Sequence, residues 1–171
     1  MPAATDFRTA AFAPSKVDSC GKYIGRNTYW KLYAIENLFR IVIHSVLSAQ
    51  LGTTWWATAA DPRIQRRAQS AQARYALRPW HTNPGSHDIY YTNLSDLSEI
   101  IRANAHLFRV IVPDIDQWIV KIQQVLLPRN IVGHMNFPSR TDRQRIDVLH
   151  SDCQMLIGHL KQQGTLQVII P

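Results

Sequence analysis

The sequence predicts an all-α protein, a bundle of about five helices. Apolar residues make up 46% of the 171 residues, which is ordinary for a globular protein. Between residues 28 and 160 they recur mostly at spacings of three and four, the period of a helix with one buried face. A strand-like apolar run occurs only at residues 166–170, so we expect a short extended C-terminal tail that docks on the body or on a partner.

The chain is long enough for one compact core and contains no internal repeat, so we expect a single domain over residues 18–171. Residues 1–17 are rich in Ala, Pro, Ser and Thr without a helical period, and we interpret them as a flexible N-terminal arm. Residues 18–27 contain two glycines and are expected to form a loop that leads into the first helix.

The first helix is predicted over residues 28–50, and it is apolar nearly all round, as in a helix buried on most sides. Between Leu32 and Gln50 its only formal charges are Glu36 and Arg40, spaced i,i+4 with the acid first, the favourable order for an ion pair. Two interpretations stay open. The pair is a structural contact that fixes how helices dock, or it lies beside a functional pocket and tunes it.

A loop or short extension is expected over residues 52–60, with Trp55 and Trp56 in the core rather than stacked on bases. Asp61 and Pro62 then read as an N-cap followed by proline at the first helical position, which predicts a helix to about residue 77.

That helix carries a basic face. No acidic residue lies between Pro62 and Ser86, so its arginines have no local counter-charge, and two interpretations stay open: a solvated face or a phosphate-binding face. The arginines expected to bind nucleic acid here are Arg63, Arg66, Arg67, Arg74 and Arg78.

Residues 79–92 are expected to be irregular, with a short extended piece at residues 88–92. Asn93 or Ser95 caps the next helix, which runs to about residue 105, and Asp114 begins the one after it. His81 and His87 stand in the irregular stretch without a nearby cysteine, so no metal site and no cofactor are predicted.

The last long helix follows Ser139, and Thr141 with Gln144 resembles a capping box at its start. Arg140 and Arg143 cluster there and are further candidates for contacts with nucleic acid. Gly164 is a plausible C-terminal stop.

The most informative stretch precedes this last helix and reads Arg129-Asn130-Ile131-Val132-Gly133-His134. Arginine grips a phosphate through two parallel hydrogen bonds, and histidine exchanges protons near neutral pH. Asn130 and His134 are four residues apart and share a helical face, so Asn130 could orient either partner. Pro128 is expected to kink or end the preceding helix, and Gly133 leaves room for close backbone approach.

An arginine and asparagine, three residues and then a histidine, at the end of one long helix and before another, resembles the signature of the HEPN superfamily. Residues 32–40, with Glu36 and Arg40, resemble the first helix of one HEPN branch, and residues 91–97 resemble the entry to its middle helix. The resemblance covers roughly residues 29–160. The chain departs from the family at Gly133, where relatives often have alanine, and at Met135, where they often have a polar residue.

The resemblance implies a metal-independent endoribonuclease with Arg129, Asn130 and His134 as catalytic residues and Glu36 and Arg40 in support. It also implies a homodimer with a composite cleft, a cyclic phosphate product, and a toxin or defence role restrained by an inhibitory protein partner. The alternative is a non-catalytic HEPN-like module that binds nucleic acid, a nucleotide or a protein, and a third is a structural interaction protein with a basic surface.

Composition agrees with a nucleic-acid partner. The formal charge is +7, which favours acidic partners, of which RNA is the one expected here. Cys20 and Cys153 are too few for a disulfide framework. The first 16 residues contain no apolar signal-peptide core, and no fully apolar run reaches membrane-spanning length, so we expect a cytoplasmic protein without a membrane partner.

Overall fold

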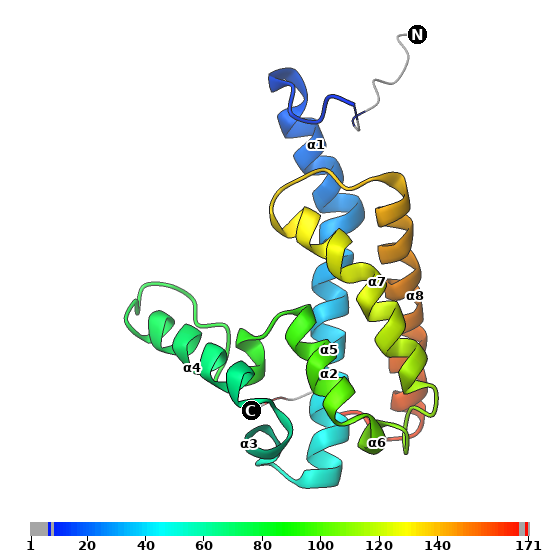
Figure 1. The fold of residues 1–171 in the computed structure, drawn as a ribbon. Coiled ribbons are helices and arrows are strands. Elements are labelled where there is room, and N and C mark those ends of the chain that lie inside the picture. Colours follow the sequence, from blue (N-terminus) through cyan, green and yellow to red (C-terminus); the bar gives the residue numbers. More distant parts are fainter. Residues whose placement is uncertain (1–6, 8, 168–169, 171) are drawn as a thin grey trace.

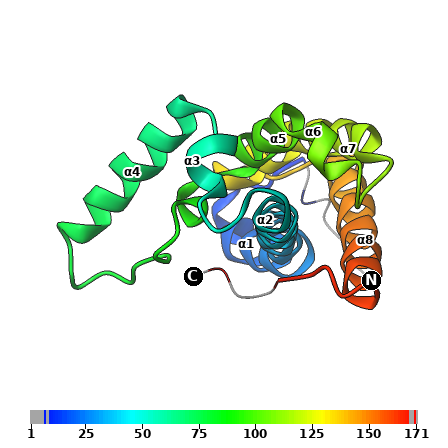
Figure 2. The same cartoon turned by 90° about the horizontal axis from the view of Figure 1, so that it is seen from below.

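The computed structural model describes residues 7, 9–167 and 170 (Figure 1). These residues form helices, turns and loops and no strand, which confirms the predicted all-α class. The core is a ring of four packed helices, α2, α5, α7 and α8, in which α2 contacts α5 and α8, and α7 contacts the same two. Figure 2 looks along α2, with α5 and α7 on one side of it, α8 beside it and α4 set apart.

The chain enters this core through one long helical stretch. A short 3-10 helix, η1 (Pro14–Lys16), precedes α1 (Val17–Ile24), and α1 continues through a π-helical turn, η2 (Gly25–Tyr29), into α2 (Trp30–Leu51). The predicted loop at residues 18–27 is therefore wrong.

Glycine content misled that prediction, because glycine disfavours a helix without forbidding it. Gly25 has helical backbone angles (φ −55°, ψ −50°), and an added Cβ would meet nothing within 4 Å at Gly21 or at Gly25. Burial of Cys20 and packing of Ile24 against the core offset the weak propensity.

Helix α2 supplies much of the core. Its buried apolar side chains include Ile35, Phe39, Ile43 and Leu47, and Phe39 meets Trp118 of α7 edge to face, with ring centroids 6.2 Å apart. The stretch Pro14–Leu51 is long and apolar enough to cross a membrane, judged by length and composition alone, yet half of its most apolar window is buried within the protein.

Two short helices and a projecting one follow α2. Residues 52–60, expected as a loop or extension, contain α3 (Trp55–Ala59), and α4 (Pro62–Ala76) agrees with the predicted span. Trp55 is fully buried, as expected, and Trp56 packs at the edge of the core. The expected extended piece at residues 88–92 is instead a 3-10 helix, η3 (Asp88–Tyr91), which contacts α4.

Helix α5 (Leu94–Ala103) begins at Asn93, as predicted, and a short α6 (Ala105–Phe108) leads to α7 (Ile115–Gly133). Pro128 lies inside α7, so of the two expected outcomes, a kink or an end, the end is wrong and the helix continues through the motif. Helix α8 (Arg140–Gln162) starts with a capping box, but its members are Ser139 and Asp142 rather than the predicted Thr141 and Gln144.

The described residues of the C-terminal tail contact the body. Gly164 ends α8 with φ +67°, as predicted, and the tail turns back onto α2. There the backbone N–H of Gln167 donates to Ser45 Oγ at 2.7 Å, and the Tyr90 hydroxyl donates to the carbonyl of Ile170 at 3.2 Å. The tail therefore docks on the body of the protein, one of the two expected alternatives. The tail residues that the structure describes form no strand, and residues 168, 169 and 171 lie outside the described part of the chain.

Of the predicted arm, residues 1–6 and 8 lie outside the described part of the chain. The Phe7 ring stacks on the rings of Tyr23 and Phe137, and Ala11 is buried.

Candidate functional site

A cleft of about 580 Å³ lies between the first half of α2 and the last turn of α7. Its walls are unusually rich in groups that bind anions: two arginines, an asparagine and three tyrosines, with one carboxylate. The residues that carry its polar groups are Tyr29, Tyr33, Glu36, Asn37, Arg40, Tyr90 and Arg129. Helical spacing places Tyr29, Tyr33, Glu36 and Arg40 on one stripe of α2, so this wall follows from the sequence.

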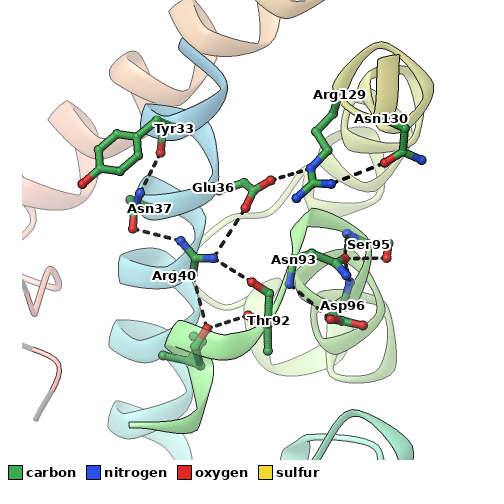
Figure 3. Close-up of polar contacts among 11 residues, drawn as sticks. Tyr33, Glu36, Asn37, Arg40, Thr92, Asn93, Ser95, Asp96, Arg129 and Asn130 are labelled. Carbon is green, nitrogen blue, oxygen red and sulfur yellow. Dashed lines mark hydrogen bonds and ion pairs between the residues drawn. The ribbon is translucent and has the colours of Figure 1, made fainter. Parts of the chain in front are cut away.

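Glu36 joins the two helices that form the cleft (Figure 3). Its Oε1 accepts a hydrogen bond from Arg129 Nε at 2.7 Å, and its Oε2 lies 3.5 Å from Arg40 Nη2. The carboxylate is 15% exposed, so both ion pairs are largely shielded from water. The predicted pair Glu36–Arg40 is present, and it forms a three-membered network with Arg129 of the motif.

Arg40 is held by several hydrogen bonds within the fold. Besides Glu36, it donates to Asn37 Oδ1 at 2.9 Å, to the carbonyl of Ile89 at 3.2 Å and to the carbonyl of Thr92 at 2.7 Å. Burial lowers the pKa of Arg40 from its ordinary value, partly offset by the charge of Glu36. The guanidinium therefore fixes the η3–α5 segment on α2, which agrees with the interpretation of the pair as a docking contact.

Only part of the Arg129 guanidinium is engaged in hydrogen bonds. Its Nη1 lies 3.5 Å from Asn130 Oδ1, a weak contact, and its Nη2 has no hydrogen-bond partner among the described residues. The side chain is 30% exposed and lines the cleft. With Glu36 counted against two arginines, the cleft has a formal excess of one positive charge, which favours an anion.

Gly133 stands one turn after Arg129, and an added Cβ there would lie 3.5 Å from Arg129 Nη1, an ordinary contact. Alanine would fit at this position. The close backbone approach predicted at Gly133 is therefore not found among the described residues.

His134 does not join this cleft within one chain. It is the C-terminal cap of α7 and is exposed, and no hydrogen bond to its ring occurs among the described residues. Its backbone N–H donates to the carbonyl of Asn130, and its own carbonyl accepts a hydrogen bond from Asn136. Asn130, one turn earlier, is also exposed. The fold thus brings Glu36, Arg40 and Arg129 together and leaves Asn130 and His134 on the outer face of α7.

Met135, directly after His134, adopts a left-handed conformation with φ 59°, which non-glycine residues rarely adopt. The backbone N–H of Met135 donates to Val132 and that of Asn136 donates to Ile131, the pattern of a Schellman cap, whose left-handed position is usually glycine. The Met135 side chain is 77% exposed and lines the cleft beside the histidine.

The arginines of α4 line a second, open groove of about 730 Å³ between α4 and the start of α5. Arg63, Arg66, Arg67 and Arg74 contribute to it, whereas Arg78 lies beyond it and donates to the carbonyl of Arg74. The expectation that these arginines have no counter-charge is wrong for two of them. Arg63 pairs with Asp61 at 3.1 Å, and Arg67 pairs with the buried carboxylate of Asp96.

Arg140 and Arg143, the two candidates for nucleic-acid contacts at the start of α8, differ in their surroundings. The guanidinium of Arg143 lies over the rings of Tyr23 and Phe137, 5.3 and 5.5 Å from their centroids, so it is occupied by cation–π contacts. Arg140 is exposed.

Sequence reasoning missed two features of the site region. Tyr90 reaches the cleft from η3, and no local pattern marks it because the contact is set by tertiary packing. A buried aromatic cluster also lies behind η3: Trp55 Nε1 donates to His44 Nδ1 at 3.2 Å, and His87 stacks on Trp55 with centroids 5.3 Å apart. Among the described residues no group of three or more His, Cys, Asp or Glu side chains is placed to hold a metal.

Comparisons of the chain with protein-family models, with curated proteins and with solved structures find no match. The HEPN resemblance therefore rests on the motif, on residues 32–40 and on residues 91–97.

Proposed function

We propose that this protein is a metal-independent endoribonuclease of HEPN type. The observation that carries the proposal is the Glu36–Arg129 contact, which joins α2 to the motif helix and holds one cationic side chain of the motif in a cleft with a surplus positive charge. Arg129 would bind the scissile phosphate through its free Nη2 and stabilise the charge that develops on it.

The chemistry needs a base and an acid. A base removes the proton of the ribose 2′-hydroxyl, O2′ attacks the phosphorus, the bond to the 5′-oxygen breaks, and an acid protonates that oxygen, leaving a 2′,3′-cyclic phosphate. His134 would serve as one of these groups and Asn130 would orient it or the phosphate. Because each chain offers one such histidine, exposed on the outer face of α7, we propose that two copies pair so that their motifs share one cleft. A protein partner that restrains this activity belongs to the same proposal.

A non-catalytic RNA- or nucleotide-binding module is the second candidate. Two observations favour it: Arg129 is already paired with Glu36, and no side chain among the described residues hydrogen-bonds to the His134 ring to orient it. General bases in enzymes are usually held by such a partner, although catalytic contacts often tighten only when substrate is bound.

The test is cleavage of a varied RNA pool in excess EDTA, with wild type beside His134→Ala. His106 is also exposed and lies on α6, away from the motif, so His106→Ala is the matched control. We expect wild type and the control to yield cyclic phosphate ends and His134→Ala to lose about 10²- to 10⁴-fold in rate. Absence of cleavage by wild type would favour the binding module, and equal rates for all three proteins would remove His134 from the mechanism.

A further inference from the structure

The groove between α4 and the η3–α5 segment has a charge imbalance that its internal contacts do not remove. Four arginines line it, against one carboxylate, Asp96. That carboxylate is 6% exposed and fully used, because Oδ2 accepts the backbone N–H of Asn93 at 3.1 Å while Oδ1 pairs with Arg67. Arg66 and Arg74 have no ion-pair partner among the described residues, and both are exposed. The groove therefore keeps free cations for an external anion.

An aromatic pair stands at the same groove. Tyr91 lines it, and the Tyr75 ring, on α4, lies 5.9 Å from that of Tyr91 at an angle of 56°. Tyr75 is 42% exposed, so part of its ring faces solvent. The Tyr91 hydroxyl donates to Asn83 and to the carbonyl of Gly85, which holds this ring in place. A fixed ring beside free arginines is what single-stranded nucleic acid uses, since its bases have open faces to stack.

The groove also leads to the cleft. Tyr90 and Tyr91 are neighbours on η3, yet Tyr90 lines the Glu36–Arg129 cleft and Tyr91 lines the arginine groove. η3 contacts α4, and Arg40 of α2 donates to the carbonyl of Ile89 on η3, so one strand that follows the surface over η3 would meet both sites.

We infer that the α4 groove binds single-stranded RNA, with Arg66 and Arg74 on phosphates and Tyr75 against a base, and feeds the strand around η3 to the cleft. This inference rests on the proposed function for the fate of the RNA, but not for its binding. A duplex offers phosphates without free base faces, so the groove prefers the single strand.

The experiment measures binding alone. A fluorescent 2′-O-methyl oligonucleotide cannot be cleaved by attack of a 2′-hydroxyl, and its anisotropy is followed with the full chain in EDTA, as a single strand and as a duplex, over a range of salt concentrations. The variant is Arg66→Glu/Arg74→Glu. Arg26→Glu/Arg102→Glu, at exposed positions on η2 and in the last turn of α5, gives the same change in charge. Tyr75→Leu removes the ring while it keeps apolar contact with Tyr91.

We expect wild type to bind the single strand at least tenfold more tightly than the duplex. The groove double variant should lose about 100-fold or more and show a salt slope smaller by about 1.4, since each phosphate contact on a single strand contributes about 0.7. Tyr75→Leu should lose about tenfold with an unchanged salt slope. Circular dichroism spectra of the variants that match wild type exclude unfolding as the cause.

Several results would overturn the inference: equal loss in the control double variant, equal affinity for duplex, or tighter binding of an acidic peptide than of the oligonucleotide. Other results would count against the proposed nuclease function and not against the groove. Binding that depends on Arg66 and Arg74 without any RNA cleavage by wild type supports the groove and rejects the nuclease, whereas cleavage without such dependence does the reverse.

Discussion

Glu36→Gln tests the contact on which the candidate site depends. Glutamine keeps the size of the side chain and one acceptor but removes the charge that Arg40 and Arg129 share. The Glu36 and Arg40 side chains are 15% and 11% exposed, so the loss exceeds the 1 kcal/mol or less of a surface pair. It stays below the roughly 3–5 kcal/mol of a fully buried pair, because Arg40 keeps three other acceptors. We expect a decrease of about 2 kcal/mol in the free energy of unfolding.

Urea unfolding followed by circular dichroism measures this change, and thermal unfolding should show a decrease of about 4–8 °C in Tm for a chain of this size. Asp147→Asn is the matched control. It breaks the 2.6 Å pair between Lys31 of α2 and Asp147 of α8, in which the aspartate is 49% exposed, and should cost less than about 1 kcal/mol.

A double-mutant cycle assigns the loss to its cause. Arg129→Met removes the cation that Glu36 holds, so adding Glu36→Gln to it should cost at least about 1 kcal/mol less than in the wild type. Two results would refute the view that Glu36 joins α2 to the motif helix. One is a Glu36→Gln variant as stable as wild type, and the other is a double variant whose loss of stability equals the sum of the two single losses.

Four further predictions concern single residues. Gly133→Ala should raise the free energy of unfolding by about 0.5–1 kcal/mol in urea titrations, since its Cβ meets only an ordinary contact and alanine is the better helix former; a loss would contradict the measured space. Met135→Gly should raise it by about 0.5–1 kcal/mol by removing a left-handed methionine, and no gain would show that the conformation is unstrained. Burial lowers the pKa of His44 and His87, so as the pH decreases the unfolded chain binds protons at these histidines before the folded chain does. The free energy of unfolding should therefore decrease at pH values under about 6.5, by at most about 1.4 kcal/mol per histidine and pH unit. Equal urea midpoints at pH 7.5 and 5.5 would contradict this. Burial raises the pKa of the Cys153 thiol to about 12, so in a Cys20→Ser background a thiol reagent at pH 8 should react only after urea is added, and fast reaction of the folded protein would show that the thiol is accessible.

Patterns within one segment predicted the structure well. The caps at Asp61 and Asn93, the stop at Gly164 and the i,i+4 pair on α2 all depend on neighbours a few residues apart, and each is present. The loop expected at residues 18–27 failed because tertiary burial of Cys20 and Ile24 outweighs glycine's low helix propensity, a term that no local pattern contains.

Charges could be paired from the sequence only where the partner was close along the chain. Glu36 meets Arg129 across 93 residues, and Asp96 meets Arg67 across 29. The absence of acids within α4 was correctly observed, yet it did not imply free arginines, because the fold delivers the carboxylate of Asp96 from another helix. Arg63 differs, because its partner Asp61 is the N-cap of α4 itself; Arg66 and Arg74 are left without an ion-pair partner among the described residues.

The place of His134 depends on where α7 ends. His134 follows Arg129 by five positions, about 140° of helical rotation, and the Schellman cap at Met135 ends α7 there with the histidine exposed. Arg129 pairs with Glu36 within the chain and Asn130 has its weak contact with Arg129, while no hydrogen bond to the His134 ring occurs among the described residues. A catalytic role for the motif thus requires a second surface against α7, whereas a binding role for the cleft requires none. The oligomeric state that accompanies cleavage therefore separates the two candidate functions more sharply than the motif itself.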